Sequence, residues 1–186
     1  MRGIILKDLY EGFCIKKNML NWLISLGLIT VLTTVNSMMR GTYGFLLIVV
    51  MILPMMGSTL LQMTVEQDEK AEFDRIQLTY PLSKMEIVLS KYLGGLLVQG
   101  GILLLSFLFL LIYVYGYQTI PLEEAIPTWG IGVAGGLIYF AVSYIVYFWL
   151  GNTKGVIFTF IAMAALVIAF LFGVFKIGSD DLIQIG

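Results

Sequence analysis

The amino-acid sequence predicts an all-α fold, a polytopic transmembrane helix bundle. Hydrophobic residues make up 59% of the 186 residues and charged residues only 12%, whereas roughly 25% of the residues of an ordinary soluble domain are charged. A soluble fold of this length has no core large enough to bury so much apolar surface. The charges are also clustered, and they leave several apolar stretches of about 20 residues, the length that a helix needs to cross the hydrocarbon core.

These apolar stretches predict five spans within a single transmembrane domain, residues 1–186. We expect the spans at about residues 19–39, 45–65, 88–115, 129–150 and 156–175. Pro54 lies inside the second of them, where it removes a backbone hydrogen bond and should kink the helix. The apolar residues that follow Asp181 resemble the beginning of a further helix, so a sixth span is expected beyond residue 186.

The distribution of lysine and arginine predicts the orientation in the membrane. All 11 basic residues except Arg40 and Lys176 lie in the N-terminal segment, between residues 66 and 91, or at Lys154. The order of the spans puts these three segments on one side. Because basic residues are enriched in cytoplasmic loops, we expect a cytoplasmic N-terminus and a cytoplasmic loop over residues 66–87.

Residues 1–17 have the pattern of an amphipathic helix in the cytoplasmic membrane interface. Its apolar residues recur at helical spacing: Ile5, Leu6, Leu9, Tyr10 and Phe13. Its charged residues turn away from them: Lys7, Asp8, Glu11 and Lys17. Such a helix either anchors the chain in the membrane or links a cytosolic partner to the first span, and the sequence leaves both interpretations open.

Ten of the 23 charged residues lie between residues 66 and 91. Good helix formers predict a short helix over residues 69–78, which ends before Pro81 because the residue before a proline avoids the helical region. Ser83 with Glu86 three residues later is the pattern of a capping box for the next helix. By composition the segment is typical of a solvated connector, but a connector needs only a few residues.

The run from Phe73 to Tyr92 reads Phe-Asp-Arg-Ile-Gln-Leu-Thr-Tyr-Pro-Leu-Ser-Lys-Met-Glu-Ile-Val-Leu-Ser-Lys-Tyr, and Glu69-Lys70 precede it. It resembles the loop between the second and third spans of type-2 permeases of ATP-binding-cassette exporters. In that family an acidic-basic pair precedes a short coupling helix, and a Thr-x-Pro-[Leu/Val]-Ser-[Lys/Arg] turn follows. The order of the interfacial helix and the spans fits the family over nearly the whole chain. A glycine often follows the pair in the family, where this chain has Ala71-Glu72.

The resemblance implies a permease subunit whose coupling helix, about residues 72–78, contacts a separate ATP-binding-cassette ATPase subunit. The residues implied in that contact are Glu69, Glu72, Phe73, Asp74, Arg75, Ile76 and Leu78. The chain contains no Gly-x-x-x-x-Gly-Lys-Ser/Thr loop. We therefore expect that it is not itself an enzyme and binds no cofactor, and that ATP and Mg²⁺ bind to the partner subunit.

The remaining partners follow from composition and from the resemblance. A second permease copy or a close relative would complete a dimeric transmembrane domain, surrounded by membrane lipid in a bacterial cell membrane. A net charge of −1 without a basic tract gives no reason to expect nucleic acid. The absence of histidine and the single cysteine exclude histidine-based catalysis and cysteine-based zinc clusters, so no metal site is expected.

Uncharged polar residues at membrane depth are the candidates for a cargo path. They are Asn36, Ser58, Thr59, Gln62 and Thr159. No charged residue lies at the centre of a predicted span, which argues against an ion-coupled carrier and against an intramembrane hydrolase. A largely apolar path suits an amphipathic peptide or a small lipophilic cargo that leaves the cell. The alternative is a non-transporting membrane anchor or immunity protein that recruits a cytosolic partner through the same loop.

Glycines recur within the fourth predicted span. Gly132 and Gly136 form a small-xxx-small pattern, which allows helices to approach closely. We expect close packing of this span against another helix of the same chain.

Overall fold

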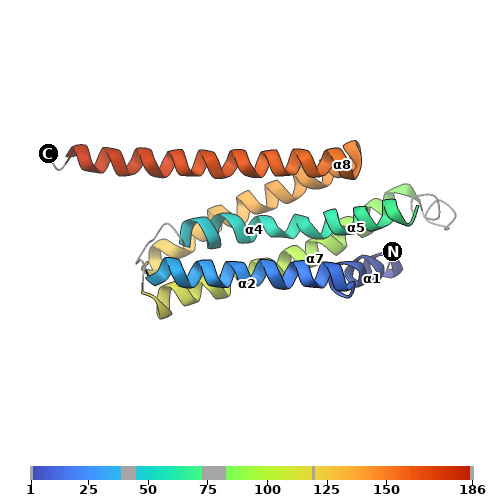
Figure 1. Cartoon of the computed structure of the whole chain (residues 1–186), viewed down its shortest axis with the longest axis horizontal. Helices are drawn as coiled ribbons and strands as arrows, with labels where there is room; N and C mark the ends of the chain where they lie inside the picture. Colours follow the sequence, from blue (N-terminus) through green and yellow to red (C-terminus); the bar gives the residue numbers. More distant parts are fainter. Residues whose placement is uncertain (1, 39–44, 73–82, 119, 185–186) are drawn as a thin grey trace.

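The computed structural model describes residues 2–38, 45–72, 83–118 and 120–184, and within these ranges it contains helices and no strand. The elements are α1 (Arg2–Phe13), α2 (Lys16–Met38), η1 (Phe45–Ile52), α4 (Leu53–Met55), η2 (Met56–Ser58), α5 (Thr59–Lys70), α7 (Lys84–Leu111), η3 (Ile112–Gly116) and α8 (Leu122–Gln184). The predicted all-α fold is confirmed. The segments η1 to α5 follow one another directly and form one rod in the middle of the bundle, with α8 on one side and α2 and α7 on the other (Figure 1).

Four helical stretches of the described residues are long and apolar enough to cross a membrane: Lys16–Val35, Leu47–Lys70, Met85–Gly116 and Leu122–Leu166. The last stretch has 45 residues, about twice the length that one crossing needs. Its backbone leaves the helical region at Gly151, with φ 73° and ψ −178°, a conformation that essentially only glycine adopts. Figure 1 shows α8 as two arms, the second folded back along the first. That each arm is a separate span stays a prediction.

The outer surface of these helices is apolar. Leu104 of α7 is 70% exposed, and Ile131 and Trp149 of α8 are 74% and 82% exposed. Soluble proteins rarely expose contiguous apolar patches of more than a few hundred Å². Lipid is the solvent that such a surface requires, in agreement with the composition.

The central rod is irregular around Pro54, where the sequence predicts a kink, and the kink itself stays a prediction. The rod is π-helical over η1 and 3₁₀-helical over η2. In a π-helix the residue five positions later donates to each carbonyl, but Pro54 has no N–H to donate to Val49. The hydroxyl of Ser106 donates to the Val49 carbonyl instead, at 2.8 Å, and the amide of Gln99 donates to the Pro54 carbonyl at 2.7 Å. Side chains of α7 thus pair the backbone groups that hydrocarbon cannot satisfy.

The first arm of α8 crosses this rod at two glycines. A Cβ atom at Gly132 would lie 2.1 Å from the carbonyl oxygen of Val50, and one at Gly136 would lie 2.7 Å from the carbonyl oxygen of Pro54. Backbones come this close only where one of them carries no side chain. The close packing predicted from the Gly132 and Gly136 pattern is confirmed.

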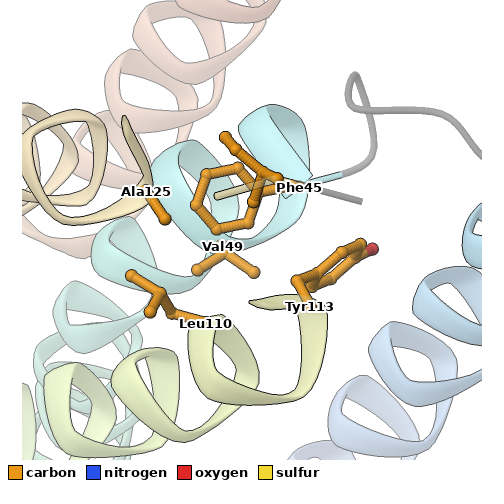
Figure 2. Packing of buried hydrophobic residues seen from close by; sticks show 6 residues of the cluster. Phe45, Val49, Leu110, Tyr113 and Ala125 are labelled. Atoms are coloured by element: carbon orange, nitrogen blue, oxygen red, sulfur yellow. The ribbon is translucent and has the colours of Figure 1, made fainter. Parts of the chain in front are cut away.

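An apolar cluster joins the beginning of the rod to the end of α7. Phe45 and Val49 of η1 pack on Leu110 of α7, Tyr113 of η3 and Ala125 of α8, and all five are fully buried (Figure 2). The rings of Phe45 and Tyr113 meet edge to face, with centroids 5.6 Å apart. This geometry is favourable for aromatic pairs, so the cluster fixes the end of the bundle that lies away from α1.

Candidate functional site: a charged end and a polar cavity

Charged side chains from three helices meet where α5 ends and α7 begins, which we call the charged end. Asp68 of α5 accepts a hydrogen bond from Lys7 of α1 at 2.6 Å and another from Lys91 of α7. Asp68 is 2% and Lys91 6% exposed. Lys7 also lies 3.0 Å from Glu11 and 3.2 Å from Asp8. These ion pairs hold α1 against α5 and α7.

The charged side of α1 faces the other helices. The sequence predicts correctly that Lys7, Asp8 and Glu11 turn away from the apolar residues of this helix. It does not indicate that Asp8 is buried among α5 and α7 while Leu6 and Tyr10 are 67% and 63% exposed. Buried charges are stable only when they are paired. The bundle pairs Lys7 with Asp68, whereas one carboxylate oxygen of Asp8 has no hydrogen-bond partner among the described residues. The exposed apolar side is the one that a membrane interface would cover.

Burial changes the acidity of the α1 side chains. It raises the pKa of the Asp8 carboxyl above its ordinary value of 3.8, and the positive charges of Lys91 and Lys7 only partly oppose this. Burial raises the pKa of Glu11 in the same way, against the hydrogen bond from Lys7. Burial also acts to lower the pKa of Lys7, but the hydrogen bond to Asp68 and the charge of Asp8 outweigh it, and this pKa is raised. Lys7 therefore remains charged, whereas the Asp8 carboxylate is held unfavourably.

We expect Asp8→Asn to stabilise the protein relative to wild type at neutral pH and to have little effect in acid. A carboxyl whose pKa is raised on folding contributes stability that is present below its unfolded pKa and lost as the pH rises through the folded pKa. The loss for Asp8 therefore begins above about pH 4. Thermal unfolding of Asp8→Asn and wild type in detergent, at about pH 4 and about pH 7, measures this pH-dependent difference in stability. A difference in Tm between the two proteins that is equal at both pH values would contradict the expectation.

Two other acidic residues near the end of α5 contact different helices. A carboxylate oxygen of Glu66 lies 3.0 Å from the ammonium nitrogen of Lys17 in α2. The carboxylate of Glu69 accepts a hydrogen bond from the backbone N–H of Asn152 at 2.9 Å. Asn152 directly follows Gly151, where the two arms of α8 meet. The end of α5 is thus connected to α1, α2, α7 and α8.

The structure describes two of the residues implied in the ATPase contact, Glu69 and Glu72. The others lie outside the described residues: Phe73, Asp74, Arg75, Ile76 and Leu78. Glu69 belongs to α5, which runs to Lys70, five residues beyond the predicted end of the second span. The chain leaves the helix at Glu72, whose φ of 49° lies in the left-handed region. Whether these residues contact an ATPase stays a prediction.

The predicted capping box at the beginning of α7 is confirmed. The hydroxyl of Ser83 accepts from the backbone N–H of Glu86 at 3.2 Å, and the carboxylate of Glu86 accepts from the backbone N–H of Ser83 at 2.8 Å. These bonds satisfy two backbone donors that a helix N-terminus leaves free. They start α7 at Lys84, four residues before the predicted third span.

Four of the five candidate path residues line one cavity. Ser58, Thr59 and Gln62, from η2 and α5, face Thr159 of the second arm of α8 across a cavity of about 140 Å³. The side chain of Asn36 lies outside the described residues. The candidates were chosen only as uncharged polar residues at membrane depth, so their meeting in space is information that the fold adds.

The hydrogen-bonding capacity of this cavity is uncharged. The hydroxyls of Ser58, Thr59 and Thr159 each donate to the backbone carbonyl three or four residues earlier, at 3.1, 2.6 and 3.0 Å. The lone pairs of these oxygens can accept further bonds, and the carboxamide of Gln62 carries both donors and acceptors. A guest can therefore form hydrogen bonds here without meeting a charge in the lining.

Two tyrosines of the cavity were not foreseen from the sequence. The hydroxyl of Tyr139 donates to the carbonyl of Thr159 at 3.1 Å, and the Tyr147 hydroxyl lies 3.5 Å from the Thr159 hydroxyl. Both line the cavity from the first arm of α8. Their separation of eight residues puts them on a similar helix face, and this spacing is the signal that could have identified them.

Two further cavities adjoin the first one. A second cavity, of about 280 Å³, lies between α2 and α5, shares Thr59 and Gln62 with the first one, which we call the polar cavity, and reaches Glu66 near the charged end. A larger, apolar cavity of about 420 Å³ lies among α1, α2, α4, η2 and α7 and shares Met56 with the first cavity. Met56 thus lies between the apolar cavity and the cavity that the candidate path residues line, which combines these polar groups with apolar side chains.

A bundle of long apolar helices with cavities between them is the fold of a membrane-embedded protein. Residues 3–185 match the model of the family described as ABC-2 family transporter protein. The chain belongs to this family and is a permease subunit of an ATP-binding-cassette transporter, the component that works with an ATPase subunit. The match confirms the family that the run from Phe73 to Tyr92 resembles. Comparisons with curated proteins and with solved structures gave no match.

Proposed function

We propose that this permease subunit forms half of the translocation path of an exporter for an amphipathic peptide or a small lipophilic molecule. The observation that carries the proposal is the meeting of Ser58, Thr59, Gln62 and Thr159 around one cavity. Polar groups at membrane depth are unfavourable unless they are paired or used. The hydroxyls of Ser58, Thr59 and Thr159 are paired with backbone carbonyls. Their gathering with Gln62 around one cavity, which a membrane anchor does not need, is what favours transport over the anchor.

The cargo class follows from the two kinds of cavity. The polar cavity offers uncharged hydrogen-bonding groups, and the apolar cavity beyond Met56 is about three times larger. A molecule with an apolar part and an uncharged polar part matches both environments. The polar cavity, at about 140 Å³, is smaller than the 300–1,000 Å³ of typical ligand pockets. Cargo passage therefore requires α5 and α8 to separate, as in a transporter that alternates between two packings.

The proposal includes a second permease copy or close relative that supplies the other half of the path, in the membrane of a bacterial cell. The N-terminus and the loop after α5 lie on the cytoplasmic side, where the ATPase subunit binds ATP and Mg²⁺ and contacts Glu69, Glu72 and residues 73–78. The convergence of α1, α5 and α7 at the charged end supports this arrangement, because it connects the loop to several helices.

Transport in proteoliposomes tests the path. We expect Gln62→Trp, in the complex with the ATPase subunit, to reduce ATP-dependent movement of a fluorescent amphipathic peptide by roughly tenfold, equivalent to about 1.4 kcal/mol. The indole would fill the cavity that Gln62 lines. The matched control is Thr30→Trp, at an exposed position of α2, which should transport the peptide as wild type does.

Three other results would change the proposal. Unchanged transport by Gln62→Trp would show that the cavity is not the path. ATP hydrolysis by the wild-type complex without movement of the peptide or of a lipophilic dye would favour the anchor.

We also expect Phe73→Ala combined with Arg75→Glu to prevent co-purification with the ATPase subunit, and intact co-purification would contradict the assigned contact.

A further inference from the structure

Three acidic residues near the end of α5 contact different helices. Successive residues of an α-helix are rotated by about 100°. Asp68 therefore points about 100° away from Glu69 and about 160° away from Glu66, whereas Glu66 and Glu69, three residues apart, lie on neighbouring sides of the helix. Glu66 contacts Lys17 of α2, and Asp68 contacts α1 and α7 through two lysines. Glu69 accepts the Asn152 N–H between the two arms of α8. Each acid thus reaches helices that the other two do not contact.

We propose that these three residues, which we call the α5 junction, transmit the ATP-driven displacement of the loop after α5 to the other helices, each residue through its own contact. Asp68 is then the positioning residue for α1 and α7, and Glu69 the positioning residue for α8. The inference rests on the proposed function, because it requires an ATPase subunit that acts on this loop. It adds the residues by which the motion is divided among the helices.

The three contacts differ in strength. The side chains of Asp68 and Lys91 are 3% and 6% exposed, so solvent screens their attraction little. The pair of Glu66 with Lys17 is 30% and 59% exposed, and exposed pairs of this kind contribute little. Among the described residues the Glu69 side chain makes one hydrogen bond, which is exposed like the pair of Glu66, but it makes this bond at the backbone beside Gly151, where the chain reverses. Asp68 and Glu69 are therefore the two residues whose effects should be measurable.

The junction and the polar cavity lie on the same helix. Gln62 precedes Asp68 by six residues, about 9 Å along the axis of an α-helix, and no break interrupts α5 between them. A displacement of the junction consequently moves one wall of the cavity. Thr159 and Tyr147 of the facing wall belong to α8. Leu61 of α5 packs on Tyr147 in an apolar cluster, and the hydrogen bond of Glu69 adds a second contact that couples this wall to α5.

Two single-label reporters test this division in the complete complex with its ATPase subunit. Cys14 is the only cysteine and is exposed just after α1, so a bimane label there reports on α1. Thr153→Cys in a Cys14→Ser background puts the same label at an exposed position two residues after Gly151, where it reports on α8. The measured quantity is the change in emission between the nucleotide-free and the vanadate-trapped state.

The expected result is a crossover. Asp68→Asn combined with Lys91→Gln, which removes both charges of the pair, should abolish most of the change at position 14 and retain the change at position 153. Glu69→Ala should do the reverse. Asp68→Glu keeps the charge and should retain both changes. Glu123→Ala, an exposed acid in the first turn of α8, is the control and should also retain both.

A purely structural role would give a different pattern. If both variants reduced both signals in equal measure, or if neither variant changed either signal, the α5 junction would be refuted while the transport function would stand. If the wild-type complex hydrolysed ATP but showed no emission change at either position, there would be no displacement to transmit, and the junction and the proposed function would both fall. Co-purification with the ATPase subunit is measured for every variant, so loss of the complex is recognised separately.

Discussion

Replacing Asp68 with leucine is expected to lower the free energy of unfolding by about 3–5 kcal/mol, the usual effect of breaking a buried ion pair from one side. Lys91 has a side chain only 6% exposed, and the substitution removes the carboxylate that it contacts. Lys7 is affected less, because Glu11 and Asp8 remain within 3.0 and 3.2 Å of it. Thermal unfolding of the purified chain in detergent measures the loss.

A double variant separates the charge from the packing. Asp68→Leu with Lys91→Met replaces both charges with apolar groups, and we expect it to recover most of the lost stability, because an apolar pair of similar volume is often as stable as a buried ion pair. The control is Lys70→Met, whose pair with Glu66 is 58% and 30% exposed and should contribute less than about 1 kcal/mol. A double variant as unstable as Asp68→Leu would show that lost packing, rather than an unpaired charge, causes the effect.

Gly136→Ala is expected to destabilise the protein by about 1–3 kcal/mol, the typical cost of overpacking. The added Cβ would lie 2.5 Å from the Pro54 Cβ and 2.7 Å from its carbonyl oxygen. Neither atom can move away by rotation of a side chain, since one belongs to the proline ring and the other to the backbone. The helices must therefore separate, which the same unfolding measurement detects.

The neighbouring glycine provides the matched control. A Cβ at Gly135 would meet no atom within 4 Å, so Gly135→Ala should leave stability unchanged or raise it by up to about 1 kcal/mol, because alanine favours the helix. Equal destabilisation by the two substitutions would mean that the close approach to Pro54 does not depend on Gly136.

Local patterns in the sequence were sufficient for the fold class and for several details. The all-α fold follows from composition and from the spacing of charges, and the capping box of Ser83 and Glu86 is a four-residue pattern that forms as expected. The small-xxx-small spacing of Gly132 and Gly136 predicts close packing, and Pro54 predicts an irregular helix. In each case the physical cause lies within a few residues of its effect.

The charged end could not be predicted in this way. Lys7 lies 61 residues before Asp68, and Lys91 lies 23 residues after it. Taken singly, Lys7 is an ordinary charge of the predicted interfacial helix, and Asp68 and Lys91 are ordinary charges near the end of a predicted span. The predicted second span ends before Glu66, whereas the helix α5 continues to Lys70 with acidic residues in ion pairs. Where the membrane span itself ends stays a prediction. The meeting of Gln62 with Thr159 likewise depends on how the helices are rotated, which the sequence does not specify.

The ion pairs of Asp68 imply an order of events during synthesis of the chain. Lys7 and Asp68 are both present once the second span has been made, whereas Lys91 follows 23 residues later. Until then the carboxylate has one of its two lysines, and α1 is joined to the nascent bundle by that single partner. The arrival of α7 completes the network and fixes the N-terminal helix in place. All residues of the charged end are therefore synthesised before either arm of α8, and the polar cavity, which needs Thr159, is the last part of the path to be assembled.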